Sequence, residues 1–147
     1  MIKTHAPCND SLPTRPDIAV AGLRVGIDIV QISAIADSLA EFGDHFTRRI
    51  FSADEVAYAN AAPAQTAQRL AARFAAKEAG FKAFGLSEAG ISWRDIEVRK
   101  STDGSCTLAF HGRAAEAVQR SGCTEISLSL SHDGDYATAM LAALAPR

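Results

Sequence analysis

The sequence predicts an α+β domain in which helices pack on one face of a largely antiparallel sheet. Apolar residues recur at helical spacing up to residue 84, and they alternate with polar residues after residue 92. The turn sequences T-D-G at 102–104 and D-G at 133–134 then join strands that we expect to be antiparallel neighbours. The 147 residues, 48% of them hydrophobic, suffice for one such domain with its own core.

The first half of the predicted domain holds one strand followed by helices. We expect a β-branched strand at 23–30, a short turn or helix at 45–51, and helices at 34–42, 53–60 and 65–84. Ser33 is expected to cap the first of these helices. Ser52, with Glu55 three residues later, forms a capping box. Gly85 is well placed to end the longest helix.

The second half is predicted to be mostly strands. We expect strands at 93–100, 105–110, 124–132 and 136–144, with one helix at 112–121. In TEISLSLSH, Ile126, Leu128 and Leu130 alternate with serines. Successive side chains of a strand point to opposite faces, so one face of this strand is expected to contact the core.

Composition restricts location and partners. Residues 1–22 are rich in Pro, Ser, Thr and Asp and are predicted to be a mobile extension, which leaves 23–147 as the domain. Three scattered cysteines and a start without a secretory signal favour the reducing cytoplasm. A net charge of −2 gives no electrostatic reason to expect nucleic acid. No apolar run approaches the roughly 20 residues of a membrane span.

Two carboxylates stand where the pattern predicts hydrophobic residues. Asp28 lies in the middle of the strand VGIDIV, and Glu78 lies in the helical stripe that contains Phe74 and Phe81. A buried carboxylate is costly unless it is paired, protonated or bound to a metal. Gly26, on the same strand face as Asp28, is expected to let a bulky group approach. Two carboxylates with open positions suit Mg²⁺, which also binds substrate phosphates.

Basic residues border Glu78 on the same helix. Arg73 and Lys77 share a face at i,i+4, and Lys82 lies four residues after Glu78. Acids that hold a metal, bordered by three bases, suggest a cradle for a pyrophosphate. Plainer interpretations stay open: Glu78 with Lys82 as an exposed ion pair, Asp28 as an acceptor of backbone hydrogen bonds, and Arg73 with Lys77 as a solvated edge.

The same residues lie in motifs that resemble a known family. The motifs are G-I-D-I-V at 26–30, R-R-I-F-S-x-x-E at 48–55, and R-F-A-A-K-E-A followed by K-A-F-G at 73–85. In order and spacing they are similar to holo-acyl-carrier-protein synthase, the small trimeric type of 4′-phosphopantetheinyl transferase. The resemblance covers about residues 24–144 and implies a 4′-phosphopantetheinyl transferase-like fold.

The resemblance implies that coenzyme A gives its phosphopantetheine arm to a serine of an apo acyl carrier protein and that adenosine 3′,5′-bisphosphate leaves. Asp28 and Glu78 match the residues that hold Mg²⁺ in the family. We expect Glu78, or a metal-bound water, to take the serine proton. The residues expected to bind the coenzyme are Arg73, Lys77, Lys82, Gly85 and His132. His132 is also typical of a surface hairpin position.

The resemblance further implies a homotrimer with the coenzyme between neighbouring subunits. Arg48 and Arg49 are the candidates for docking the acidic carrier. The sequence departs from the family after Gly85, where the second glycine of G-T-G is absent, and at Ala34, where many members carry arginine. Two alternatives therefore stay open. One is a trimer that binds coenzyme A or a carrier without transfer, and the other is a purely structural ion network.

Overall fold

The computed structural model describes residues 22–87 and 90–146, so the predicted extension lies almost entirely outside the described residues. Its elements are β1 (Arg24–Gln31), α1 (Ile32–Phe42), α2 (Asp44–Ile50), α3 (Ala53–Asn60), α4 (Thr66–Phe84), β2 (Ile96–Lys100), β3 (Cys106–Phe110), α5 (Gly112–Arg120), β4 (Glu125–Asp133) and β5 (Tyr136–Leu144), with single 3₁₀ turns at Pro63–Gln65 and Trp93–Asp95. The α+β prediction is confirmed, and the strand and helix positions agree with the sequence pattern to within a few residues.

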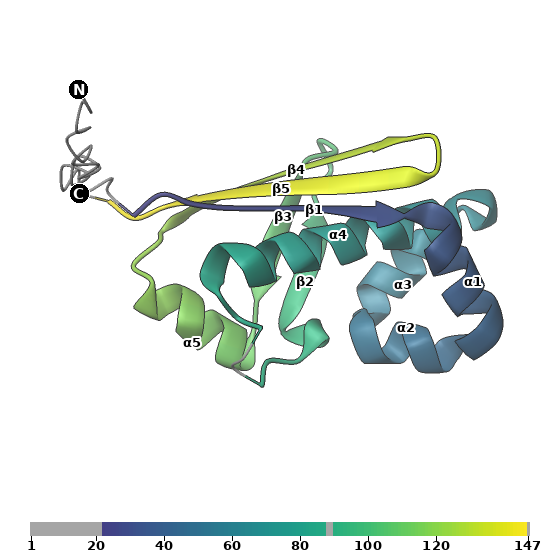
Figure 1. Ribbon diagram of the computed structural model, residues 1–147, viewed down its shortest axis with the longest axis horizontal. Helices are drawn as coiled ribbons and strands as arrows, with labels where there is room; N and C mark the ends of the chain where they lie inside the picture. The colour runs from purple at the N-terminus through teal and green to yellow at the C-terminus, as the bar shows by residue number, and fades with distance from the viewer. Residues whose placement is uncertain (1–21, 88–89, 147) are drawn as a thin grey trace, which may run out of the picture.

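The described strands form two antiparallel sheets. One has the order β1-β5-β4, and the other is the β2-β3 hairpin. Figure 1 shows α4 running along the larger sheet, with α1, α2 and α3 gathered at one end of α4 and α5 near the other. Helix α4 also packs against the smaller sheet, because a Cβ atom at Gly80 would lie 3.4 Å from Ile96 and 3.5 Å from Leu108.

At Gly26 the backbone of α4 lies directly against β1. A Cβ atom at this position would lie 1.9 Å from the carbonyl oxygen of Ala79 and 3.0 Å from the nitrogen of Ala83. Only glycine permits this approach, because no real Cβ atom tolerates such distances. The space that we predicted beside Asp28 for a bulky group is therefore filled, at Gly26, by the backbone of α4.

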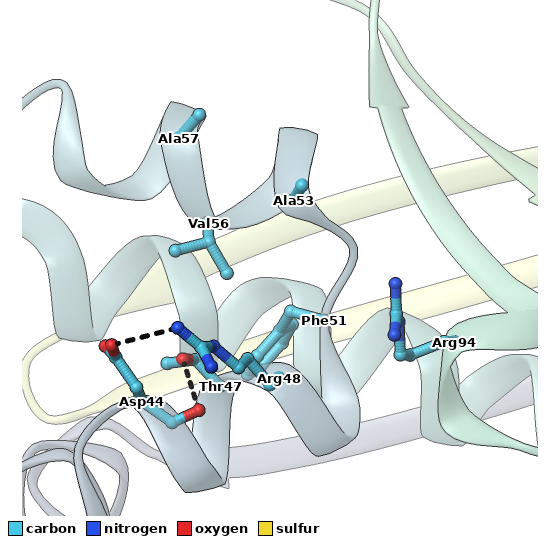
Figure 2. Close-up of a pocket in the computed structure, with 8 residues that line it drawn as sticks. All are labelled: Asp44, Thr47, Arg48, Phe51, Ala53, Val56, Ala57 and Arg94. Atoms are coloured by element: carbon cyan, nitrogen blue, oxygen red, sulfur yellow. Dashed lines mark hydrogen bonds and ion pairs between the residues drawn. The ribbon is translucent and has the colours of Figure 1, made fainter.

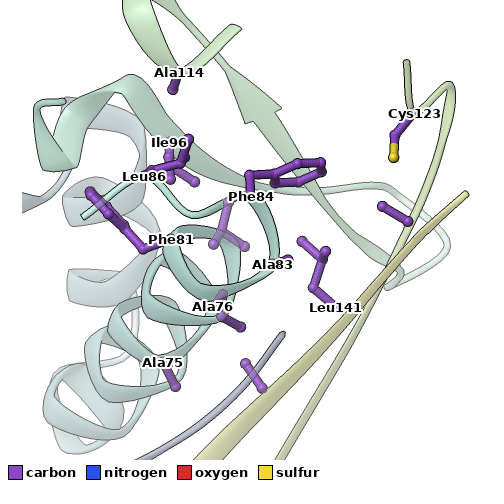
Figure 3. Close-up of a cluster of buried hydrophobic side chains, with 14 residues drawn as sticks. Ala75, Ala76, Phe81, Ala83, Phe84, Leu86, Ile96, Ala114, Cys123 and Leu141 are labelled. Atoms are coloured by element: carbon purple, nitrogen blue, oxygen red, sulfur yellow. The ribbon is translucent and has the colours of Figure 1, made fainter. Parts of the chain in front are cut away.

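The main core lies between α4 and the two sheets (Figure 3). Helix α4 contributes small residues, such as Ala75 and Ala76, where it meets other elements closely, and large ones, such as Phe84, where gaps must be filled. The Phe84 ring meets the Phe110 ring edge-to-face with centroids 5.5 Å apart. Full burial of one large apolar side chain, such as Leu141, stabilises the fold by about 1.5–3 kcal/mol.

The predicted N-cap of α1 is wrong. We expected Ser33 to cap this helix, but the side-chain acceptor comes from the β4-β5 turn. Asp135 accepts hydrogen bonds from the Ser33 backbone N–H at 2.8 Å and from the Ser33 hydroxyl at 2.6 Å. The capping box of α3 is confirmed, since Ser52 and Glu55 exchange both of the hydrogen bonds that define it.

The face of the larger sheet opposite α4 exposes apolar side chains, and we call it the outer sheet face. Its exposed apolar members are Val25, Ile27 and Ile29 on β1 and Tyr136, Met140 and Leu144 on β5. On β4 the predicted alternation is confirmed, because the serines are exposed and Leu128 packs against the core. Exposed apolar surfaces of this kind are typical of interaction sites.

Candidate functional site

Three charged side chains meet where α4 lies against β1. The Lys82 ammonium lies 2.8 Å from Asp28 Oδ1 and donates a second hydrogen bond, at 3.0 Å, to the carbonyl oxygen of Ile27. The Lys82 side chain is 52% exposed and the Asp28 side chain 16%. Lys82 therefore pairs across to the strand and not along its own helix with Glu78. Among the described residues, no backbone N–H donates to the Asp28 carboxylate, so the interpretation of Asp28 as an acceptor of backbone hydrogen bonds has no support there.

Glu78 is half-buried on α4 beside this pair. Burial raises the pKa of the Glu78 carboxyl, and the negative charge of Asp28 raises it further, while Lys82 lowers it. The effect of Asp28 on Glu78 shows that the two carboxylates lie near each other. A carboxylate with a raised pKa close to a charged partner is a suitable proton acceptor near neutral pH.

The donor set fits a hard divalent cation. Asp28 is near enough to Glu78 for its charge to raise the pKa of Glu78, and the Lys82 ammonium already balances Asp28. Among residues 22–87 and 90–146, no cluster of three or more metal-ligating side chains occurs. A metal at Asp28 and Glu78 would thus complete its shell with water and phosphate oxygens, which is the habit of Mg²⁺.

The predicted coenzyme contact of Lys77 is wrong. Its side chain is fully buried, and its ammonium lies 2.9 Å from Glu55 Oε2, whose side chain is also fully buried. It donates further hydrogen bonds to the carbonyl oxygens of Trp93 and Ile96. Lys77 has no exposed atom with which to contact a ligand. It is neither a solvated edge nor a phosphate contact, because it joins α4 to α3 and to the start of β2.

Arg73 is also buried, and it faces α3. Its guanidinium lies 4.1 Å from the centroid of the Tyr58 ring and donates to the carbonyl oxygen of Arg69. Burial lowers the pKa of Arg73, and the charge of Glu55 opposes this. Arg73 lines a cavity with residues of α3 and β2 and none of β1. The structure thus separates Arg73 from Asp28, although the prediction grouped them.

Gly85 and His132 lie on different elements, Gly85 at the end of α4 and His132 in β4. Gly85 ends α4 in the left-handed conformation, with φ 64°, and its N–H donates to the Phe81 carbonyl oxygen, so helix termination alone explains this glycine. His132 lies near the end of β4 and shares a hydrogen bond of 3.1 Å with Gln68. Strand β5 separates β4 from β1, so one chain does not bring His132 to Asp28.

The two candidate docking arginines lie on α2 and line different cavities. Arg48 is exposed, forms an ion pair of 3.6 Å with Asp44, and lines a cavity of about 370 Å³ whose apolar wall includes Phe51. Figure 2 shows Arg94 at the side of this cavity opposite Arg48. Arg49 lines an apolar cavity of about 450 Å³ that also includes Trp93. Both arginines are accessible, and neither lies at the Asp28–Glu78 site.

The partners of the two buried cations, Lys77 and Arg73, were not predicted from the sequence. Glu55 was recognised as part of a capping box and of the R-R-I-F-S-x-x-E motif, but not as the acceptor of the Val98 N–H or as the partner of Lys77. Tyr58 was not singled out, although three cations lie around its ring. The only sequence signal was that Lys77 lies on the apolar stripe of α4, which indicates burial and therefore a buried partner.

The comparisons with known proteins agree on one family. The family model for the 4′-phosphopantetheinyl transferase superfamily matches residues 24–141. A protein of Koribacter versatilis named holo-acyl-carrier-protein synthase is 44% identical over 80% of this chain and 94% of its own length. The protein of the same name from Gloeobacter violaceus is 39% identical over 82% and 92%.

Solved structures agree with the sequence relatives. An acyl carrier protein synthase of Chronobacterium ammoniagenes, in complex with coenzyme A, superposes with a TM-score of 0.75 at 33% identity and covers 85% of this chain and 98% of its own. The holo-acyl-carrier-protein synthase of Helicobacter pylori, also in complex with coenzyme A, has a TM-score of 0.70 at 28% identity over 81% and 98%. The likeness therefore covers nearly the whole of each relative.

Proposed function

The chain belongs to the 4′-phosphopantetheinyl transferase superfamily, and we propose that its Asp28–Glu78 site carries a Mg²⁺-dependent transfer that releases adenosine 3′,5′-bisphosphate. The enzyme class follows from the relatives: this is a holo-acyl-carrier-protein synthase, which moves phosphopantetheine from coenzyme A to an apo acyl carrier protein. The observation that carries the proposal is the meeting of Asp28, Glu78 and Lys82 on α4 and β1.

In the proposed reaction the carrier serine hydroxyl attacks the β-phosphorus of the coenzyme pyrophosphate. An oxygen–phosphorus bond to the serine forms, and the bond from that phosphorus to the bridging oxygen breaks. Glu78, or a water bound to the metal, takes the serine proton. Adenosine 3′,5′-bisphosphate leaves with the bridging oxygen.

Asp28 and Glu78 are the residues that would hold Mg²⁺. Bound there, the ion would neutralise the charge that develops on the phosphate oxygens. Lys82 is proposed to neutralise the same charge, because its ammonium is half-exposed and lies beside Asp28. Its bond to Asp28 leaves the ammonium free to exchange partners when a phosphate arrives, since an exposed ion pair contributes at most about 1 kcal/mol.

We propose that the enzyme is a homotrimer assembled through the outer sheet face. Ile27 and Ile29 are 60% and 65% exposed, which is unfavourable for a face that stays in water. Strand β4 lies two strand spacings, about 10 Å, from β1. We propose that His132 contacts a coenzyme bound at Asp28 of a neighbouring subunit.

The carrier is proposed to dock on α2. Arg48 and Arg49 are exposed there, and Arg49 borders the apolar cavity that includes Trp93. Charges at the rim of an apolar recess steer an acidic partner and fix its orientation.

The coenzyme role of Gly85 stays a prediction, because Glu88 and Ala89 of the loop after it lie outside the described residues. The cytoplasmic location also stays a prediction, since among the described residues the structure adds only that no helix has the length and hydrophobicity to cross a bilayer.

Intact-mass spectrometry of an apo acyl carrier protein tests the reaction. With coenzyme A and Mg²⁺ we expect a gain of one phosphopantetheine, which a chelator abolishes. Glu78→Gln is expected to abolish the gain, whereas Glu116→Gln, an exposed carboxylate on α5, retains it. Full activity of Glu78→Gln overturns the assignment of the base. Coenzyme binding without a gain on fatty-acid, polyketide or peptidyl carriers favours the non-catalytic alternative.

Sedimentation velocity tests the assembly separately. Ile27→Glu places a charge on the outer sheet face and is expected to yield monomers. Thr107→Glu, which alters an exposed position on β3, is the matched control and is expected to leave a trimer. A wild-type protein that sediments as a monomer at micromolar concentration contradicts the trimer.

A further inference from the structure

Asp135, in the turn between β4 and β5, holds the junction between β1 and α1. Its carboxylate accepts hydrogen bonds from the Ser33 N–H at 2.8 Å, the Ser33 hydroxyl at 2.6 Å and the Gln31 side-chain amide at 2.9 Å. Its backbone carbonyl oxygen accepts a fourth, from the Ile32 N–H at 2.8 Å. Three consecutive residues are thus tied to one residue that lies 102 positions after Ser33 and beside the start of α1 (Figure 1).

Helix α1 has no cap of its own at its N-terminus among the described residues. Gln31, which precedes the helix, makes no capping hydrogen bond, and the first turn carries no acidic residue. The Asp135 carboxylate therefore supplies both the acceptor and the negative charge that stabilise this helix end. The hydrogen bond from the Ser33 hydroxyl, and then those from the Gln31 amide and the Ser33 N–H, hold the pKa of Asp135 below its ordinary value. The carboxylate is therefore charged at neutral pH.

Packing holds α1 less firmly than the hairpin that carries Asp135. Of the described residues of α1, Ile35 alone is buried, and Ile32 and Leu39 are half-buried. The hairpin, in contrast, is fixed by two ladders, because β4 pairs along the whole of β5 and β5 pairs along the whole of β1. Loss of the Asp135 bonds would therefore release the start of α1 and leave the hairpin, with His132, in place.

The orientation of α1 also affects α2 and the cavity beside it. Gly43 alone separates the two helices. Phe42, the last residue of α1, lines the cavity of about 450 Å³ together with Arg49 and Trp93. Phe42 is 53% exposed, so it forms part of the surface that a partner in this cavity would meet. The recess proposed to receive the carrier is thus built by α1 and α2 together.

We propose that Asp135 is a positioning residue for carrier recognition: by anchoring the start of α1, it holds Phe42 and α2 in the orientation that the carrier binds. The inference rests on the proposed docking of the carrier at α2. Asp135 contacts the first turn of α1, at the opposite end from Phe42, and acts through the helix. Without this anchor α1 keeps its docking orientation for only part of the time, and the apparent affinity for the carrier falls in the same proportion.

Steady-state kinetics of carrier modification by the full chain test this role. Asp135→Ala is expected to raise the KM for the apo carrier about fivefold, the usual scale of a lost N-cap. It is expected to change kcat and the KM for coenzyme A by less than about twofold, because those quantities depend on residues of α4, β1 and β4. Asp135→Asn keeps one oxygen that can accept from the Ser33 N–H, so an intermediate KM is expected. Asp133→Ala is the matched control: it removes the same charge from an exposed position of the same hairpin, and wild-type behaviour is expected.

Hydrogen exchange reports on the anchor directly. The amide of Ser33 is expected to exchange about fivefold faster in Asp135→Ala than in wild type, whereas the amides of β5 are expected to be unchanged. The proposal is overturned if Asp135→Ala has the wild-type KM for the carrier. It is also overturned if Asp133→Ala raises that KM equally, which indicates a charge effect, or if kcat alone falls, which indicates a loss of folded protein.

Calorimetric titration of the apo carrier into the enzyme, without coenzyme A, separates this inference from the proposed function. A wild type that binds the carrier but does not modify it contradicts the proposed function, and its carrier affinity still tests Asp135. Binding about fivefold weaker in Asp135→Ala, with Asp133→Ala unchanged, supports the positioning role. Equal affinities of wild type and Asp135→Ala, or a wild type that does not bind the carrier, overturn it.

Discussion

Helix α4 carries two lysine–carboxylate pairs five residues apart, and they differ in almost every physical respect. Lys77 meets Glu55 at 2.9 Å with both side chains fully buried. Lys82 meets Asp28 at 2.8 Å with the lysine half-exposed. The distances are nearly equal, so geometry alone does not distinguish a structural ion pair from a functional one. Burial and the remaining hydrogen bonds do.

The buried pair is saturated. Glu55 accepts from the backbone N–H groups of Ser52 and Val98 at 2.8 Å and 2.9 Å, and Lys77 donates to two carbonyl oxygens besides Glu55. Burial lowers the pKa of the Lys77 ammonium, and Glu55 opposes this. No partner in this network is free to exchange. The pair therefore holds α3, α4 and β2 together.

The exposed pair is unsaturated. Lys82 has the Ile27 carbonyl oxygen as its only other partner among the described residues, and Glu78 beside it remains half-buried with a raised pKa. Because this pair is exposed to solvent, the Lys82 ammonium is able to leave Asp28 and bind a ligand. A functional site needs this exchange, which a stabilising network cannot offer.

The largest change in the free energy of unfolding is expected when the buried pair is broken. Lys77→Met leaves the Glu55 charge buried without its cation, and we expect a loss of about 3–5 kcal/mol in the free energy of unfolding. Urea denaturation measures it. A loss below about 1 kcal/mol, as for an exposed pair, would erase the distinction drawn between the two pairs.

Gly26→Ala tests whether the exposed pair depends on the close approach of α4 to β1. The added methyl group meets the Ala79 carbonyl oxygen, so we expect a cost of about 1–3 kcal/mol from overpacking. Carrier modification should fall as well, because Asp28 moves relative to Glu78. Gly80→Ala is the control, since its methyl group makes ordinary contacts. Equal stability of the two variants contradicts the packing argument.

The Glu78 carboxyl predicts a pH dependence. Its pKa is raised above the ordinary 4.5, so the folded protein holds the proton more tightly than the unfolded chain. The resulting stability is fully present below the unfolded pKa and is lost as pH rises through the folded pKa. Glu78→Gln removes this loss. In chelator, denaturation at several pH values should show the variant gaining stability relative to wild type as pH rises, and a constant difference would be the contrary result.

The smallest stability effect is expected for Lys82→Met, at most about 1 kcal/mol, because its ion pair is half-exposed. Its effect on carrier modification should nevertheless be about tenfold or more, since a charge-assisted contact to phosphate is lost. Denaturation and intact-mass kinetics on the same preparation separate the two quantities. A large stability loss with unchanged kinetics would make this pair structural like the first.

Local patterns account for the parts of the site that the sequence located. Asp28 and Glu78 stood out because each breaks an apolar pattern, and Lys82 follows Glu78 by one helical turn. The structure brings these three together. Lys77 was misassigned, because helical spacing shows which face a residue occupies but not which distant element covers that face. Arg73 was grouped with Asp28 for the same reason.

By itself the sequence determined the order and type of the elements, the capping box of α3, the glycine that ends α4 and the alternation in β4. Each of these depends on residues a few positions apart, where backbone geometry is decisive. Only the tertiary structure decided the partners of Lys77 and Arg73 and the cap that Asp135 places on α1, 102 residues from Ser33. Those contacts join segments far apart in the chain, so their energies depend on packing that no local spacing encodes.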